Sequence, residues 1–259
     1  MCCSSEQCSV RNVRRRPMTK VVTSACYSDP VKPGAVGLRE TWVAPVRRPP
    51  DVPAVRVEDP LSPGGILQSL FLKWKPTGKN AVQGASAQDM QRWLKRMLEE
   101  SCSTEGTARF VQHSREFGWR LLALMTRFGI RVQILDGAEY RKRQGVTTAG
   151  RYWNRFKTAV FNEEYLTSQV GLVHHEMGHA LDHLISALCL QGNCCSTMLW
   201  HGFKGQRQGF VTDYAQKNPR EYFAESVEAY FRPDQRWLLQ HQDAGMHAFL
   251  QALFELSRH

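Results

Sequence analysis

The sequence predicts an α+β fold in two parts: a basic, proline-rich tail or linker at residues 1–63 and one globular domain at residues 64–259. Three observations lead to this prediction. Nine of the twelve prolines lie in residues 1–63, where helices are therefore not expected and little apolar surface can be buried. From Gly64 onward apolar residues recur at helical spacing, and two short stretches have the pattern of strands. We expect the tail to be disordered and the domain to hold a short mixed sheet among helices.

The first predicted elements are two amphipathic helices. Ser86 and Asp89 have the spacing of a capping box. The apolar residues that follow share one helix face: Met90, Trp93, Leu94, Met97 and Leu98. A second helix is expected from about residue 107 to residue 128, ended by Gly129. The inward face of this helix would carry Phe117, Leu121, Leu124, Met125 and Phe128.

Two strands are predicted next. Ile130 to Leu135 alternates apolar and polar residues and then meets Asp136 and Gly137, which predicts a strand that ends in a turn. Lys157 to Asn162 is the second candidate. The basic residues between the strands, near Gly145 and Gly150, are expected to be irregular.

Three further helices complete the domain. One is expected from about residue 165 to residue 190, and a long loop follows it through several glycines. Asn218 and Pro219 then open a helix, because asparagine is a good N-cap and proline suits the first helical position. A last helix is expected from residue 234 to about residue 256.

The charge of the chain is positive. There are 34 Lys and Arg residues against 24 Asp and Glu residues, a net charge of +10. A basic field attracts polyanions, but here the charges are spread out with no block of five like charges, as on a solvated surface. Specific binding to nucleic acid is therefore not expected.

Other features narrow the class of protein. The longest apolar run, Leu121 to Met125, is five residues long, so no transmembrane segment is expected. The first thirty residues lack the apolar stretch of a secretory signal. The eight cysteines show no paired C-x-x-C spacing, which favours reduced thiols, although Cys2 and Cys3 have the alternative of acylation. We expect a monomer.

The strongest chemical signal is the pentad His175-Glu176-Met177-Gly178-His179. On a helix, residues four apart lie one turn apart on the same side, so both imidazoles can reach one zinc ion. Glu176 is rotated by about 100° from His175, too far to ligate but well placed to hold a water on the metal. It is therefore the candidate general base. His174 is expected to be structural, and a metzincin is excluded because Asp182 and Ile185 replace its further Gly and His.

A second acidic helix offers the third ligand that a catalytic zinc needs. Glu221, Glu225 and Glu228 fall on one face of the helix that begins at Pro219. His183 is excluded, since it lies about 12 Å along the helix axis from His175. These residues alone leave the three glutamates as alternatives.

Together the two blocks resemble a known family. The pentad with Ala180-Leu181-Asp182, then Asp213-Tyr214-Ala215, then the run from Asn218 to Glu225 is similar to the catalytic domain of anthrax lethal factor and of the clostridial Pro-Pro endopeptidase, a zincin metalloprotease group. The resemblance covers roughly residues 130 to 232, and Tyr214 precedes Glu221 by seven residues as in the family.

This resemblance implies a zincin-like domain that hydrolyses peptide bonds with Zn²⁺. It assigns the ion to His175, His179 and Glu221, with Glu176 as general base and Tyr214 steadying the transition state. Glu225 and Asp182 are expected beside the ligands, and Glu228 at the surface or in packing. A protein or peptide substrate would lie extended along an edge strand, for which Lys157 to Asn162 is the candidate. The family likeness also favours a toxin- or effector-like protease secreted by a non-classical route, with a cytoplasmic location as the alternative.

Two other functions remain open from the sequence. One is a regulatory metalloprotease of the antirepressor-cleaving type, which His183 and the Phe223-Ala224 pair would suit. The other is a basic nucleic-acid-associated protein whose zinc site is structural or degenerate. A catalytic site keeps an exchangeable water on the metal, whereas a structural site is closed by four protein ligands.

Overall fold

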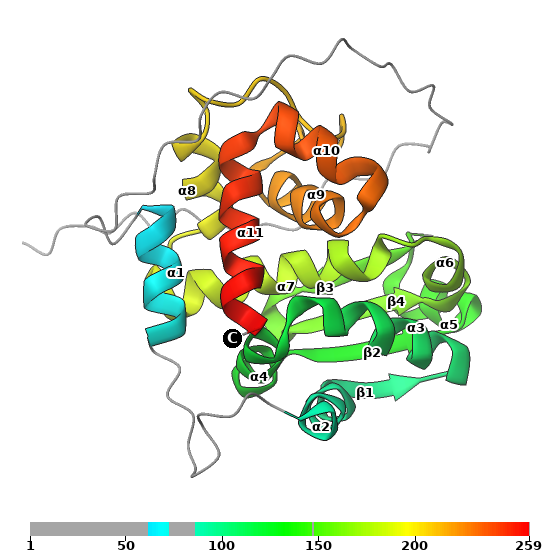
Figure 1. Cartoon of the computed structure of the whole chain (residues 1–259). Helices are drawn as coiled ribbons and strands as arrows, with labels where there is room; N and C mark the ends of the chain where they lie inside the picture. Colours follow the sequence, from blue (N-terminus) through cyan, green and yellow to red (C-terminus); the bar gives the residue numbers. More distant parts are fainter. Residues whose placement is uncertain (1–61, 73–85, 147, 259) are drawn as a thin grey trace, which may run out of the picture. The chain divides into compact units, whose positions relative to one another are not determined.

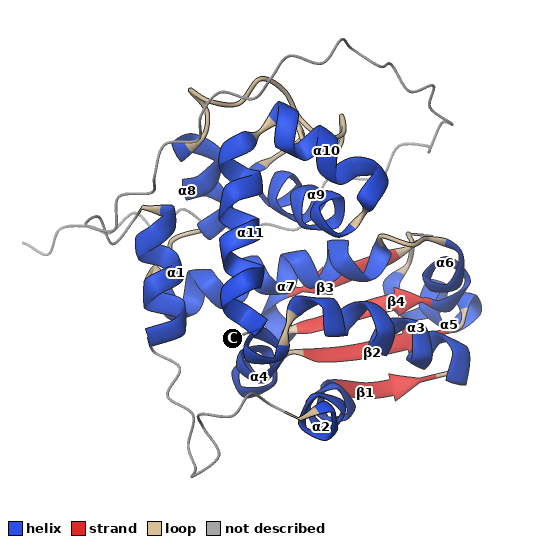
Figure 2. Ribbon diagram, in the orientation of Figure 1, coloured by secondary structure: helices blue, strands red, loops and turns tan. Residues whose placement is uncertain are grey.

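The strands of the described residues form one short mixed sheet, drawn in red in Figure 2. The structure is a computed structural model that describes residues 62–72, 86–146 and 148–258, so the expectation of a disordered tail lies outside the described residues. The strands are β1 (Leu98–Ser101), β2 (Arg131–Leu135), β3 (Gly150–Trp153) and β4 (Thr158–Asn162), in the order β1-β2-β4-β3. β1 and β4 run parallel to β2, and β3 runs antiparallel to β4. The predicted α+β fold with a short mixed sheet is confirmed.

Helices account for most of the described residues (Figure 1). Those before β4 are α1 (Pro63–Leu72), α2 (Ala87–Met97), α3 (Thr104–Ser114), α4 (Trp119–Phe128) and α5 (Gly137–Gln144), with the short 3-10 helices η1 (Arg115–Phe117) and η2 (Asn154–Phe156). Those after β4 are α6 (Glu163–Ser168), α7 (Leu172–Cys189), α8 (Cys195–Gly202), α9 (Pro219–Phe231), α10 (Pro233–Gln242) and α11 (Ala244–Arg258). No helix among the described residues has the length and apolar character needed to cross a membrane.

The two faces of the sheet carry different helices. Along β4, Ala159 and Phe161 belong to the main core, which includes the apolar side chains of α7. Val160, between them, packs instead with Leu135 and with Tyr140 of α5. Side chains alternate between the faces of a strand, so α7 and α5 cover opposite faces.

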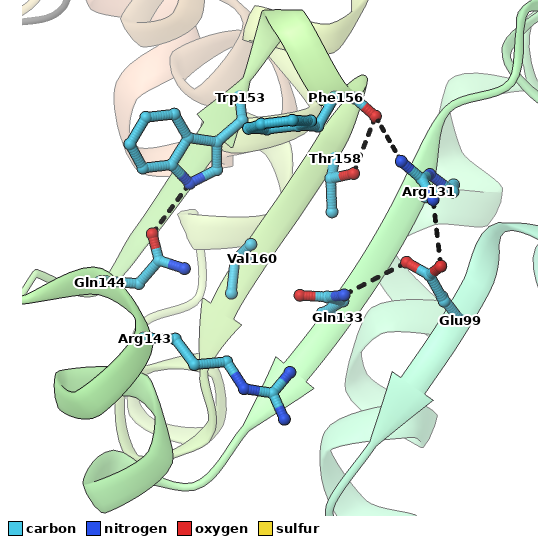
Figure 3. A pocket seen from close by; sticks show the side chains of 9 residues that line it. All are labelled: Glu99, Arg131, Gln133, Arg143, Gln144, Trp153, Phe156, Thr158 and Val160. Carbon is cyan, nitrogen blue, oxygen red and sulfur yellow. Dashed lines mark hydrogen bonds and ion pairs between the residues drawn. The ribbon is translucent and has the colours of Figure 1, made fainter.

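A pocket of about 320 Å³ lies on the α5 side of the sheet (Figure 3). Polar groups on its wall are already paired: Arg131 and Gln133 both donate to Glu99, and the Trp153 indole donates to Gln144. The lining residues are Glu99, Arg131, Gln133, Arg143, Gln144, Trp153, Phe156, Thr158 and Val160. None of the predicted site residues is among them.

The helix α9 packs directly against α7. A Cβ atom added at Gly178 would lie 3.1 Å from the Ala224 Cα, so the two backbones approach closely at this point. This contact fixes the pentad helix relative to the acidic helix.

Several local signals in the sequence correspond to the observed helix ends. The Ser86 hydroxyl accepts from the Asp89 N–H and the Asp89 carboxylate accepts from the Ser86 N–H, which is the predicted capping box. Gly129 ends α4 in the left-handed region, at φ 86°. Asn218 caps α9, with Pro219 in its first turn.

The helix predicted from 107 to 128 is wrong in one respect, because it is divided at Gly118 into α3 with η1 and α4. Gly118 has φ 83°, and a side chain there would collide with Ser257, whose hydroxyl donates to the Phe117 carbonyl. The break therefore follows from a contact with α11, which lies far away in the sequence.

Other boundaries also differ from the prediction. Asp136 does not begin a turn after β2 but caps α5, accepting from the N–H groups of Ala138 and Glu139. The helix expected from 165 to 190 is two helices, α6 and α7, and the one expected from 234 to 256 is α10 and α11. The prediction did not include α1, α5, β1, β3 or α8. Because β3 pairs with β4, the edge strand on this side is β3 and not the Lys157 to Asn162 segment.

Candidate active site

The two histidines of the pentad lie one turn apart on α7. Their ring centroids are 5.0 Å apart, and the His175 and His179 side chains are 14% and 8% exposed. Both rings therefore share one partly covered site between α7 and α9.

The helix α9 brings a carboxylate to these rings at its first turn. The Asn218 side chain accepts hydrogen bonds from the backbone N–H groups of Arg220 and Glu221, which starts the helix and fixes the position of Glu221. Glu221 Oε2 lies 3.3 Å from His175 Nε2 and 3.4 Å from His179 Nε2. The same oxygen is buried and has no hydrogen-bond partner among the described residues.

The spacing of these three atoms fits a zinc ion. Ligand atoms about 2.0–2.1 Å from a tetrahedral zinc lie about 3.3–3.4 Å from one another. The two distances from Glu221 Oε2 match that edge length, and all three ligand atoms lie within 4.8 Å of one another. Two imidazole nitrogens and one carboxylate are a common ligand set of catalytic zinc, which leaves one position open.

The charges of the cluster reinforce one another. Burial opposes ionisation of His175, but the adjacent carboxylates of Glu221, Glu225 and Glu228 outweigh it and raise its pKa well above the usual value. Burial likewise acts to raise the pKa of Glu221, yet the imidazoles of His175 and His179 beside its carboxylate lower it strongly. The glutamates thus form an anionic pocket that attracts a cation.

Glu176 lies beside this cluster, at the start of β3. A Cβ atom at Gly150 would lie 2.8 Å from Glu176 Cγ, so the strand passes directly over this side chain. The Glu176 carboxylate is buried, and its Oε2 has no hydrogen-bond partner among the described residues. Burial raises the pKa of Glu176, which makes the carboxylate a stronger base.

Two further glutamates hold the other ring nitrogen of His175. Glu225 Oε1 lies 3.3 Å and Glu228 Oε2 3.5 Å from His175 Nδ1. Glu225 is itself fixed by a 2.6 Å hydrogen bond from the Thr212 hydroxyl, and Glu228 by an ion pair of 3.2 Å with Arg232. A carboxylate on the free nitrogen of a ligating histidine sets its tautomer and orientation.

The contact of Glu228 with His175 shows that the expectation of a surface or packing role for Glu228 is wrong. Its carboxylate occupies the space left by the missing side chain of Gly171, where an added Cβ would collide with it. The sequence placed Glu228 on the same face as Glu221 and Glu225, but only the packing of α9 against α7 shows which atoms meet. The supporting role of Thr212 had no signal in the sequence.

Tyr214 lies at the open side of the cluster. Its ring centroid is 6.2 Å from that of His175, and the residue is 40% exposed. Burial of the remainder, with Glu221 nearby, raises the pKa of the hydroxyl, so Tyr214 stays protonated and can donate a hydrogen bond. The loop that carries it is fixed by the Thr212 hydroxyl, which accepts from the Ala215 N–H at 3.0 Å.

The remaining polar residues of α7 make other contacts. Asp182 accepts hydrogen bonds from the Ser196 N–H at 2.8 Å and the Ser196 hydroxyl at 2.9 Å, so it fastens α8 to α7 instead of holding a pentad histidine. His183 lies 3.0 Å from the Tyr152 hydroxyl and edge-on to Phe128, outside the cluster. His174 is buried against Phe117 and Phe231.

The part of the chain that contains this cluster is similar to known proteins. Residues 148–253 match the family described as anthrax toxin lethal factor, N- and C-terminal domain. Among solved structures, the Pro-Pro endopeptidase from Paenibacillus alvei is similar over 62% of this chain and 99% of its own, with 17% sequence identity and a TM-score of 0.48. No curated protein sequence matches the chain. The family match confirms the resemblance to the lethal factor family, and the matched range contains the whole cluster from His175 to Glu228.

Proposed function

We propose, from the family match over residues 148–253 and the geometry of the cluster, that this chain is a zinc-dependent endopeptidase. The observation that carries the proposal is the placement of Glu221 Oε2 at 3.3 Å and 3.4 Å from the two pentad nitrogens. His175, His179 and Glu221 would hold the ion. Three protein ligands, with no fourth in this group of described residues, favour a catalytic site over a closed structural one.

Bound zinc would lower the pKa of a coordinated water toward about 7 and polarise the carbonyl of the scissile bond. Glu176 would accept the proton of the attacking water, since its buried carboxylate has a raised pKa and no competing hydrogen bond on Oε2. The same carboxyl group would then donate that proton to the leaving amine. The Tyr214 hydroxyl would donate a hydrogen bond to the oxyanion that forms on the substrate carbonyl.

An extended peptide would bind along β3. This strand is an edge of the sheet, and its first residue, Gly150, contacts Glu176. Backbone groups on the free side of an edge strand pair readily with an added peptide strand. Pairing there would bring a peptide bond to the general base, with Tyr214 on the exposed side of the cluster.

The test is cleavage of a peptide library derived from a proteome. Zinc-loaded wild-type protein should cleave, chelation should abolish cleavage, and added Zn²⁺ should restore it. Mass spectrometry of the products would give the preferred scissile bond. A metal-replete wild-type protein that cleaves no peptide contradicts the proposal.

Glu176→Gln is the matched control, because glutamine has nearly the same shape but cannot accept the water's proton. We expect this variant to bind zinc normally. Its activity should be at least about 100-fold lower, because a general base usually contributes at least that factor. Near-normal turnover of a zinc-loaded Glu176→Gln protein would show that another group is the base.

A further inference from the structure

A second group of metal-binding side chains lies next to the site already described. His113 in the last turn of α3, Glu116 in η1 and His174 at the start of α7 offer one ligand atom each, all within 4.8 Å of one another. Glu116 Oε1 lies 3.2 Å from His113 Nδ1 and 3.6 Å from His174 Nε2. The first distance is close to the edge of a zinc tetrahedron, and the second exceeds it by a few tenths of an ångström.

The burial of His174 is the second observation. Its side chain is 2% exposed, and neither ring nitrogen has a hydrogen-bond partner among the described residues. The ring is fixed by stacking on Phe231 at 4.5 Å and Phe117 at 5.9 Å. A buried imidazole without a hydrogen bond is costly, so a ligand for its nitrogen would remove that cost.

Glu116 completes the set from the solvent side. Its side chain is 40% exposed, which gives an ion a way in and leaves room for water at the remaining position. Burial acts to raise the pKa of this carboxyl group, but a hydrogen bond with His113 and the nearby imidazole of His174 bring it to about 2. The group is therefore an anion at neutral pH and needs no deprotonation to bind a metal.

We propose that His113, Glu116 and His174 form a second site for Zn²⁺, separate from the cluster of His175, His179 and Glu221. Two imidazoles and a carboxylate are ligands of the kind that zinc prefers. The last turn of α3 and the adjoining η1 supply two ligands three residues apart, and α7 supplies the third. A bound ion would link α3 and η1 to the first turn of α7, the turn that also carries His175.

The experiment is zinc analysis of the full-length chain and its variants after dialysis against Zn²⁺. His113→Ala removes one ligand at a partly exposed position, and His174→Phe removes another while keeping an aromatic ring between Phe117 and Phe231. His201→Ala, at an exposed histidine of α8, is the matched control. The zinc content of each variant is compared with that of wild type. Zinc held by the cysteine thiols is the same in all of them and does not affect the difference.

We expect His113→Ala and His174→Phe each to bind about one Zn²⁺ fewer than wild type, and His201→Ala to bind the same amount. His179→Ala should also lose about one ion, and zinc should still raise its Tm unless His113→Ala is added. Unchanged zinc content in folded His113→Ala overturns the second site whatever His179→Ala shows. Loss of zinc in His113→Ala but not in His179→Ala would keep the second site and overturn the metal at the proposed active site.

Discussion

Three glutamates share one face of α9, but their contacts differ. Glu221 meets the Nε2 atoms of both pentad histidines, whereas Glu225 and Glu228 meet only the Nδ1 of His175. The first would bind the metal directly, and the other two would act through the orientation and tautomer of a ligand.

We therefore expect a graded series when each glutamate is replaced by alanine. Glu221→Ala should abolish activity and the binding of zinc between His175 and His179. Glu225→Ala should weaken zinc affinity by about 10–100-fold, and Glu228→Ala by about tenfold, because its contact is longer and Glu225 remains on the same nitrogen. Zinc affinity measured by competition with a chelator checks the order. If the site of His175 and His179 were fully loaded in Glu221→Ala and empty in Glu225→Ala, the ligand would be one turn further along α9.

At the scale of single residues, the sequence predicted which side chains lie together when they belong to the same helix. His175 and His179 meet because residues four apart always share a side of a helix, and Glu221, Glu225 and Glu228 share a face for the same reason. Which oxygen reaches which nitrogen depends on how α9 packs against α7. For this reason the role of Thr212 and the contact of Glu228 could not be predicted from spacing.

At the scale of elements, the end of α7 and the face of α9 depend on each other. Gly171 is the N-cap of α7, and the carboxylate of Glu228 fills the place where a side chain at Gly171 would be. The backbone there, at φ −89° and ψ −12°, is one that alanine adopts readily.

Gly171→Ala should therefore leave the fold intact and displace the flexible Glu228 carboxylate from His175. We expect zinc affinity to fall by about as much as in Glu228→Ala, roughly tenfold. Gly202→Ala is the control, since nothing lies within 4 Å of an added Cβ there. Equal zinc affinities of Gly171→Ala and wild type would show that Glu228 does not hold His175.

Helix ends with their own chemical signal were predicted from the sequence, and those set by distant contacts were not. The capping box at Ser86 and the cap at Asn218 are hydrogen bonds between residues close in the sequence, so the residue types alone predict them. The break at Gly118 depends on Ser257 of α11, and β3 becomes a strand only by pairing with β4. Neither contact can be deduced from neighbouring residues.

At the scale of the whole molecule, we expect stability to depend on pH through histidines that folding partly buries, such as His183. Burial lowers its pKa from 6.5 to about 4 in the folded chain. Between these values the unfolded chain binds more protons than the folded one, so the stabilising contribution is full above 6.5 and is lost as the pH falls toward 4.

We expect metal-free wild-type protein to lose more unfolding free energy between pH 7 and pH 5 than His183→Gln, which cannot titrate but can still pair with the Tyr152 hydroxyl. Urea unfolding at both pH values, in the presence of a chelator, measures the difference. The exposed His201→Gln variant should behave like wild type. Parallel losses in wild type and His183→Gln would assign the pH dependence to other groups.

No strand of the described residues pairs with the outer side of β3, which has a consequence for the protein in concentrated solution. A free strand edge pairs as readily with another copy of the same chain as with a peptide, and such pairing begins aggregation. Arg151 on this strand and the net charge of +10 make copies of the chain repel one another. Salt weakens that repulsion. We therefore expect self-association through β3, the surface proposed for substrate binding, to increase with ionic strength.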